Sequence, residues 1–284
     1  MALAEAASCT PETWAGLACH RLQLVNGDCV RVAEHGAQVL SWCSGGRERL
    51  FLSERAVLDG RAPIRGGVPL CWPQFNQRGP LPKHGFARQC RWHAGPVRVG
   101  SDAVELDLQL HHDERTLAQW PVRFKAMVTV RLAPGQLRIV LQLENPGTEP
   151  FAFTGALHSY LAVDDVAQAR LHGLDGQAEG DAVADVHAQA APALMFAGEF
   201  DRVYAAPPAA LELVDGPHRL RISQSPDWAD VVVWNPGAAK GDALADMAPG
   251  AWRHMLCVEA AQVFQPIVLD AGAVWQGWQA FTLA

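Results

Sequence analysis

The chain of 284 residues is 49% hydrophobic and 19% charged, so it can bury a sizeable core and is not disordered in bulk. The net charge of −7 argues against a nucleic-acid-binding protein. No apolar run is long enough to span a bilayer, the Ala-rich N-terminus lacks the basic residues of a signal peptide, and the seven cysteines include no CxxC pair. We therefore expect a cytoplasmic protein with reduced thiols and neither a nucleic-acid nor a membrane partner.

Most of the predicted elements are strands with one buried face. Residues 1–20 are expected to be a peripheral segment, with a short helix near 12–17; further short helices are possible at 113–119 and 238–247. Apolar and polar residues alternate at 104–110, 124–132, 137–144, 211–214 and 220–223, while 231–234 and 255–258 have the pattern of buried strands. The Ala-rich stretch 177–198 has the weakest pattern and is predicted to be an excursion or loop. We expect one domain over residues 1–284, all-β and mainly antiparallel.

The segment 61–101 is a basic island in an acidic chain. It contains seven of the 23 Lys and Arg residues and none of the 30 Asp and Glu residues. Such an island suggests a site for an anion, because the arginine fork donates bidentate hydrogen bonds to phosphate. It could equally be a solvated face or a patch that pairs with acids elsewhere in the chain.

The residue types in the same segment favour a ligand-binding site. Arg65-Gly-Gly-Val-Pro-Leu-Cys-Trp-Pro-Gln-Phe75 mixes glycines, which let the backbone approach a ligand closely, with Trp72 and Phe75, whose apolar faces suit the C–H face of a sugar. Pro82-Lys-His-Gly-Phe-Ala-Arg88 then places three donors, Lys83, His84 and Arg88, in one short stretch. A purely structural loop needs no such density of donors.

These two motifs resemble the glucose-6-phosphate 1-epimerase branch of the aldose 1-epimerase superfamily. Three further motifs follow in the family's order: Thr154-Gly-Ala-Leu-His-Ser-Tyr160, Asp201-Arg-Val-Tyr204 and Met255-Leu-Cys-Val-Glu259, with Val233-Trp-Asn-Pro236 between the last two. The resemblance spans about residue 24 to the C-terminus. It implies a galactose-mutarotase-like β-supersandwich, a reaction without a cofactor or metal, and a cytoplasmic enzyme that is a monomer or a weak homodimer.

The resemblance also implies roles for individual residues. His158 and Glu259 match the catalytic pair, and Asp201 matches a ligand of the sugar hydroxyls. The positions matching substrate and phosphate ligands are Arg65, His84 and Arg88. Lys83 departs from the Gln that is familiar before His-Gly in relatives, and Gly237 stands where an aromatic residue is common.

The implied reaction opens a hemiacetal and closes it on the other face. One group removes the proton of the C1 hydroxyl, and another protonates the ring oxygen as the C1–O5 bond breaks. A carboxylate suits the first role and an imidazolium the second, so we expect Glu259 to be the base and His158 the acid. Arg65 and Arg88, with Lys83, would hold the 6-phosphate and position the reacting end of the sugar.

Other interpretations stay open at this point. His158 could be a satisfied core histidine, and Asp201 could be a simple turn charge. The enzyme could instead act on free sugars as an aldose 1-epimerase, or the chain could be a non-catalytic sugar-phosphate-binding module. Asp201 and Glu259 could also be the carboxylate pair of a glycoside hydrolase or lyase. His111 and His112 are adjacent and cannot easily share a metal, and motifs for nucleotide binding or acyl transfer are absent from the sequence.

Overall fold

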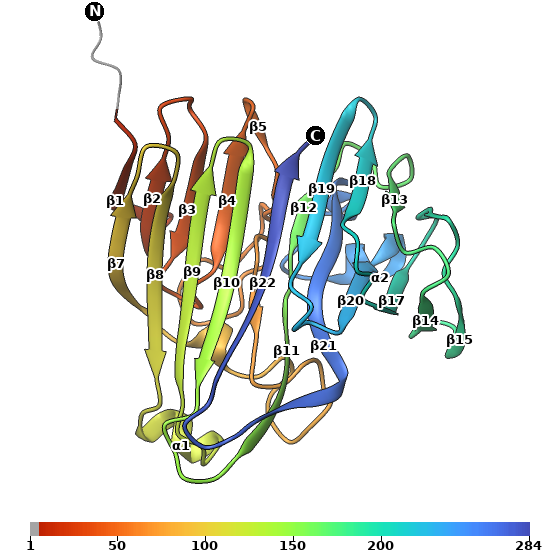
Figure 1. The fold of residues 1–284 in the computed structure, drawn as a ribbon. Coiled ribbons are helices and arrows are strands. Elements are labelled where there is room, and N and C mark those ends of the chain that lie inside the picture. The colour runs from red at the N-terminus through yellow and green to blue at the C-terminus, as the bar shows by residue number, and fades with distance from the viewer. Residues whose placement is uncertain (1–5) are drawn as a thin grey trace, which may run out of the picture.

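The computed structural model describes residues 6–284, which form three antiparallel β-sheets with a few short helices (Figure 1). The five-stranded sheet follows chain order: β1 (Ser8–Trp14), β2 (Leu17–Gln23), β3 (Cys29–Ala33), β4 (Val39–Ser44) and β5 (Arg47–Glu48). The nine-stranded sheet has the spatial order β16 (Ala193–Leu194), β13 (Arg170–His172), β18 (Leu211–Asp215), β19 (His218–Gln224), β22 (Val274–Leu283), β10 (Gln136–Glu144), β9 (Lys125–Ala133), β8 (Val104–His111) and β7 (His93–Val99).

The eight-stranded sheet carries most of the functional site. Its order is β15 (Val186–Gln189), β14 (Ala178–Asp181), β17 (Phe200–Ala205), β20 (Asp230–Asn235), β21 (Met255–Leu269), β11 (Phe151–Leu157) and β6 (Leu70–Cys71), and β12 (Tyr160–Ala162) also pairs with β21. The helices are α1 (Glu114–Gln119), α2 (Gly237–Ala243) and the 3-10 turns η1 (Ala87–Gln89) and η2 (Ala251–His254). The expected all-β, mainly antiparallel fold is confirmed. Within residues 6–284, no helix is long and apolar enough to cross a bilayer.

Period-two patterning explains the strands that the sequence predicts well. In β9, the alternate residues Ala126, Val128, Val130 and Leu132 are all buried. A two-residue turn at 134–135 joins β9 to β10, so that Ala133 pairs with Gln136. One continuous core gathers buried side chains from all three sheets, and each fully buried aliphatic side chain in it contributes about 1.5–3 kcal/mol.

Two expectations about local structure are wrong. Residues 12–17 are not helical: Ala15 and Gly16 both have positive φ and form the two-residue turn of the β1–β2 hairpin, in which Trp14 pairs with Leu17. Residues 177–198 are not a plain loop, because β14, β15 and β16 lie within them. The short helices expected at 113–119 and 238–247 are present as α1 and α2, and Asp113 caps α1 by accepting a hydrogen bond from the Thr116 backbone.

The segment expected at the periphery takes part in the five-stranded sheet. Within it, β1 is an edge strand with half-buried and exposed side chains, while Leu17 and Cys19 at the start of β2 are buried. Residues 1–5 of that expectation lie outside the described part of the chain.

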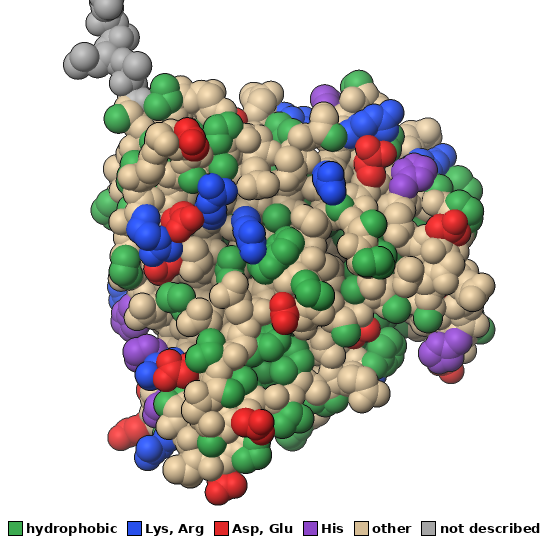
Figure 2. Space-filling view, viewed as in Figure 1, with side chains coloured by type: hydrophobic (Ala, Val, Ile, Leu, Met, Phe, Trp, Pro, Cys, Tyr) green, Lys and Arg blue, Asp and Glu red, His purple; other side chains and the backbone are tan. Residues whose placement is uncertain are grey.

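The basic island is divided by the fold. Arg91 pairs with Glu34, and Arg98 pairs with Glu105 and Asp107. Figure 2 shows basic and acidic side chains interspersed over the face seen in Figure 1. The interpretation as a patch paired with acids therefore holds for this part of the segment, and only its other part can serve a ligand.

Candidate active site

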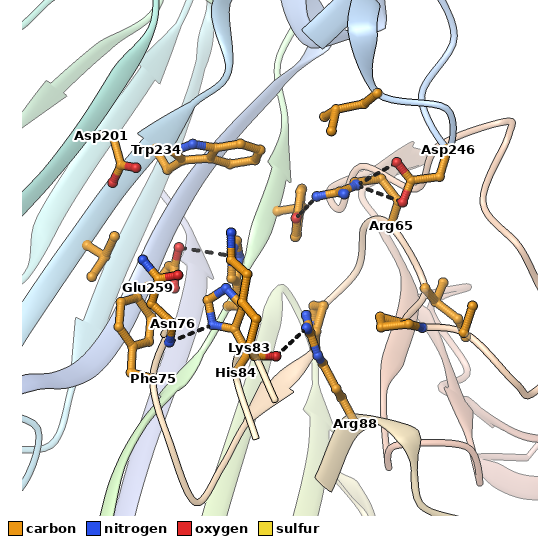
Figure 3. Close-up of a pocket in the computed structure, with 18 of the residues that line it drawn as sticks. Arg65, Phe75, Asn76, Lys83, His84, Arg88, Asp201, Trp234, Asp246 and Glu259 are labelled. Carbon is orange, nitrogen blue, oxygen red and sulfur yellow. Dashed lines mark hydrogen bonds and ion pairs between the residues drawn. The ribbon is translucent and has the colours of Figure 1, made fainter. Parts of the chain in front are cut away.

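A cavity of about 330 Å³ opens on the side of the eight-stranded sheet that faces away from the main core. Alternation along β21 sets this arrangement: Val258 and Ala260 point into the core, whereas Glu259 lines the cavity. All seven residues predicted for the site line this one cavity: Arg65, Lys83, His84, Arg88, His158, Asp201 and Glu259. Figure 3 shows the irregular segment that carries Lys83, His84 and Arg88 facing the strand residues.

His158 sits where the chain breaks between β11 and β12. Its backbone N–H donates to Pro69 O at 3.0 Å. The next residue, Ser159, donates through its hydroxyl to Gln279 at 2.6 Å, and Gln279 donates to the Val258 carbonyl at 3.0 Å. This buried polar chain fixes the break, so the backbone that carries His158 is held on both sides.

His158 and Glu259 form a close, buried pair. His158 Nδ1 lies 3.3 Å from Glu259 Oε1, and the Glu259 side chain is 1% exposed. Neither His158 Nδ1 nor Glu259 Oε2 has a hydrogen-bond partner among the described residues. Unsatisfied buried polar atoms are costly, and they are found where a ligand completes the network.

Burial shifts the pKa values of Glu259 and His158 in opposite directions. It raises the pKa of Glu259 well above its ordinary value, with the Asp201 carboxylate adding to the effect. It lowers the pKa of His158 well below the ordinary value, and the cations Arg88 and Arg65 lower it further. Burial therefore favours the uncharged forms of the pair, a carboxylic acid beside a neutral imidazole.

His84 presents one ring nitrogen to the cavity as a donor. The Asn76 backbone N–H donates to His84 Nδ1 at 3.2 Å, which places the ring proton on Nε2. Burial and the charges of Arg88 and Lys83 lower the pKa of His84 to about 3, so the ring stays neutral. A neutral Nε2–H can donate to a sugar oxygen without adding a charge.

The turn that carries His84 depends on Gly85. Its φ is +69°, and an added Cβ would lie 2.2 Å from Trp72 O. We expect Gly85→Ala to lower the free energy of unfolding by about 3 kcal/mol, measured by denaturant titration. Gly176 has the same φ of +69° but nothing within 4 Å of its added Cβ, so Gly176→Ala should cost only about 1 kcal/mol. Equal losses in the two variants would contradict the close-approach argument.

The cations of the segment differ in their partners. Arg65 is paired with Asp246, with Nε 3.2 Å from the carboxylate oxygens (Figure 3). Arg88 donates to the Lys83 carbonyl at 2.8 Å, and its Nε is buried without a hydrogen-bond partner in the described part of the chain. Among residues 6–284, neither Lys83 nor Arg88 has an acidic partner. These two are the uncompensated charges of the cavity.

Asp201 and Trp234 are cross-strand neighbours on β17 and β20, and both line the cavity. Burial raises the pKa of Asp201, while Lys240 opposes that effect. Sequence reasoning missed Trp234, Asn76, Lys240 and Asp246. The alternation that places Val232 on this face of β20 also places Trp234 there and could have identified it.

The expectation that Trp72 faces a sugar is wrong. Trp72 is fully buried and packs edge-on against Phe124 and Trp120 in the main core. Phe75 does line the cavity, with its ring edge-on to His84 at 5.1 Å. The apolar wall of the site is therefore Phe75 and Trp234.

The donor set suits a metal poorly. His158, Cys257 and Glu259 offer ligand atoms within 4.8 Å of one another. Burial raises the pKa of Cys257 well above its ordinary value, and a thiol must lose its proton to bind a metal. Burial likewise raises the pKa of Glu259 and favours its neutral form. Acid/base work fits these groups better than metal binding.

A family model described as aldose 1-epimerase matches residues 20–282. The chain therefore belongs to the aldose 1-epimerase family. Two relatives that carry the provisional name glucose-6-phosphate 1-epimerase are similar to it. One, from Cenchrus ciliaris, is 35% identical over 88% of this chain and 79% of its own length, and one from Salmonella typhimurium is 33% identical over 82% and 80%.

Solved structures agree with this placement. A Salmonella typhimurium protein described provisionally as a mutarotase has a TM-score of 0.88 and 28% identity, covering 97% of this chain and 93% of its own. A galactose 1-epimerase from Lactobacillus acidophilus has a TM-score of 0.76 at 13% identity, covering 98% and 99%. The expected galactose-mutarotase-like β-supersandwich is confirmed.

Proposed function

We propose that the protein is a mutarotase that interconverts the α and β anomers of a hexose 6-phosphate, with glucose 6-phosphate favoured. One observation carries this proposal: the uncompensated charges of Lys83 and Arg88 line the same cavity as the His158–Glu259 pair. An acid/base pair suits the opening of a hemiacetal ring, and cations without acidic partners suit the binding of a phosphate at the other end of the sugar. The names of the relatives support the same substrate.

In the proposed mechanism, Glu259 accepts the proton of the C1 hydroxyl and His158 protonates the ring oxygen. The aldehyde end rotates, and the reverse transfers close the ring on the other face. The pair holds one mobile proton whether it is written as neutral or as ionised. A bound phosphate offsets the charges of Arg88 and Arg65, which favours movement of that proton from Glu259 to His158.

The remaining residues position the sugar. Asp201 accepts hydrogen bonds from sugar hydroxyls, and His84 donates from Nε2. Trp234 and Phe75 contact the C–H face of the ring. Arg88 and Lys83 hold the phosphate, together with Arg65.

The activity is tested by magnetisation exchange between the α and β anomeric protons. Acceleration is expected with glucose 6-phosphate and is compared with galactose and mannose 6-phosphates and with free glucose. Equal acceleration of glucose and its 6-phosphate would instead support an aldose 1-epimerase for free sugars. Binding without acceleration would indicate a non-catalytic module, and any product besides the opposite anomer would indicate a hydrolase or lyase.

The pH dependence of kcat/KM follows from the shared proton of the free enzyme. Below the lowered pKa of His158 a second proton binds and no base is left, and above the raised pKa of Glu259 the last proton is lost and no acid is left. We therefore expect a broad plateau, with an acid limb set by His158 and an alkaline limb set by Glu259. Exchange rates measured from about pH 5 to about pH 9 check this, and a narrow maximum centred near the ordinary histidine pKa would contradict it.

We also propose that the protein is cytoplasmic and is a monomer or a weak homodimer. All seven cysteines are free thiols, which supports a reducing cytoplasm. One chain brings all seven predicted site residues to a single cavity, which supports a monomer or a weak homodimer. Light scattering coupled to gel filtration measures the assembly.

A further inference from the structure

Asp246 lies between α2 and η2, 181 residues along the chain from Arg65, and both residues line the cavity. Its carboxylate accepts from Arg65 Nε at 3.2 Å. Ser53 holds the two partners together: its backbone N–H donates to the Arg65 carbonyl at 3.0 Å, and its hydroxyl donates to the Asp246 carbonyl at 2.7 Å. The scaffold thus fixes this ion pair from both ends before any ligand binds.

Arg65, held in this ion pair, also contacts Tyr160. Arg65 Nη1 donates to the Tyr160 hydroxyl at 3.1 Å. The Tyr160 ring is 3% exposed and stacks on the His158 ring, with the centroids 4.8 Å apart and the planes 9° from parallel. Trp234 packs edge-on against both rings, at 6.0 and 6.1 Å.

Ring contacts help to orient the His158 imidazole. Its Nδ1 lies 3.3 Å from Glu259 Oε1 but makes no hydrogen bond to a described residue. The orientation of the ring therefore depends on its neighbours, which are the parallel stack on Tyr160 and the edge-on rings of His84 and Trp234. The Tyr160 hydroxyl is in turn held by Arg65.

We propose that Asp246 is a positioning residue that acts through Arg65 and Tyr160 to hold the His158 imidazole in its reacting orientation. This proposal rests on the proposed mutarotase function. It divides the cavity's three cations from the basic island into two groups: Arg65 donates from Nε to Asp246 and from Nη1 to Tyr160, whereas Arg88 and Lys83 have no acidic partner among residues 6–284. Arg65 thus serves the reacting end of the sugar as much as the phosphate end.

The test is Asp246→Asn, assayed by anomer exchange of glucose 6-phosphate in the full-length protein. We expect kcat to fall about tenfold and KM to change less, because a misoriented catalytic group affects the transition state more than binding. Loss of the carboxylate also leaves the Arg65 charge unopposed, which lowers the pKa of His158, so the acid limb should move to lower pH. Asp246→Glu keeps the carboxylate and should restore most of kcat.

Controls separate positioning from folding. Asp102 is exposed on the β7–β8 hairpin and does not line the cavity, so Asp102→Asn makes the same charge change and should leave kcat as it is. Tyr160→Phe removes only the hydroxyl that Arg65 holds. The double variant with Asp246→Asn should be no slower than the slower single variant, because both changes break one chain of contacts.

Three outcomes would overturn the inference: kcat within twofold of the wild type in Asp246→Asn, a lowered kcat with an unmoved acid limb, or additive losses in the double variant. If Asp246→Asn does not fold, Tyr160→Phe decides: a fall in kcat with little change in KM is expected, and a kcat within twofold of the wild type would overturn the inference. Absence of anomer exchange in the wild type would instead reject the proposed function itself.

Discussion

Replacing Glu259 by glutamine is expected to lower kcat for anomer exchange of glucose 6-phosphate by about 10³-fold, because the variant loses the group that carries the mobile proton. Glutamine has nearly the same shape, so the cavity should keep its form. Magnetisation exchange at saturating substrate measures the loss. His158→Ala should produce a loss of similar size, and near-normal exchange in both variants would show that the proton chemistry lies elsewhere.

The Glu259→Gln variant should also be more stable than the wild type at neutral pH. A carboxyl group whose pKa is raised by folding stabilises the folded state most at low pH, and this contribution is lost as the pH rises towards its folded pKa. Glutamine carries no such ionisation. We therefore expect Glu259→Gln to have a higher Tm than the wild type at pH 8 and a smaller advantage at pH 5. Lost activity together with a lower Tm at pH 8 would point to misfolding instead of lost chemistry.

Replacing Arg88 by glutamine is expected to raise KM for glucose 6-phosphate by about 10- to 100-fold, because charge-assisted hydrogen bonds to the phosphate are worth about 1.5–3 kcal/mol. The preference for glucose 6-phosphate over glucose should shrink by a similar factor. Steady-state exchange rates with both sugars give the ratio.

Arg78 supplies the matched control for this change. It belongs to the same basic island but packs over the Phe264 ring at 4.9 Å and does not line the cavity. Arg78→Gln should keep the wild-type preference for the phosphorylated sugar. If Arg88→Gln raised KM equally for glucose and glucose 6-phosphate, Arg88 would support the cavity in general and would not be its phosphate ligand.

The strands were predictable where one face is buried and the other is exposed to solvent. The alternation at 124–132 and 137–144 corresponds to β9 and β10 because each strand covers the core with every second side chain. The helix expected near 12–17 failed because a two-residue turn with positive φ reverses the chain there, and such a turn decides the structure more strongly than local composition.

The predicted members of the site were brought together by the fold, but their partners were not predictable. Lys83, His84 and Arg88 share one motif, whereas Asp246 meets Arg65 only through the path of the chain between α2 and η2. Trp72 was misplaced because an aromatic residue in a Gly- and Pro-rich motif can face either a ligand or the core. Its packing against Phe124, a distant residue, decides between them.

The cavity is assembled from two kinds of backbone. Glu259 lies on β21 and His158 at the break between β11 and β12, whereas Lys83 and Arg88 lie in the segment 74–88, whose regular structure is the turn η1. Substitutions at these two cations can therefore change phosphate recognition with little effect on the strands that carry the reactive pair. Variation at positions 83 and 88 is thus a route by which the proposed enzyme could come to accept a sugar with a different group at C6.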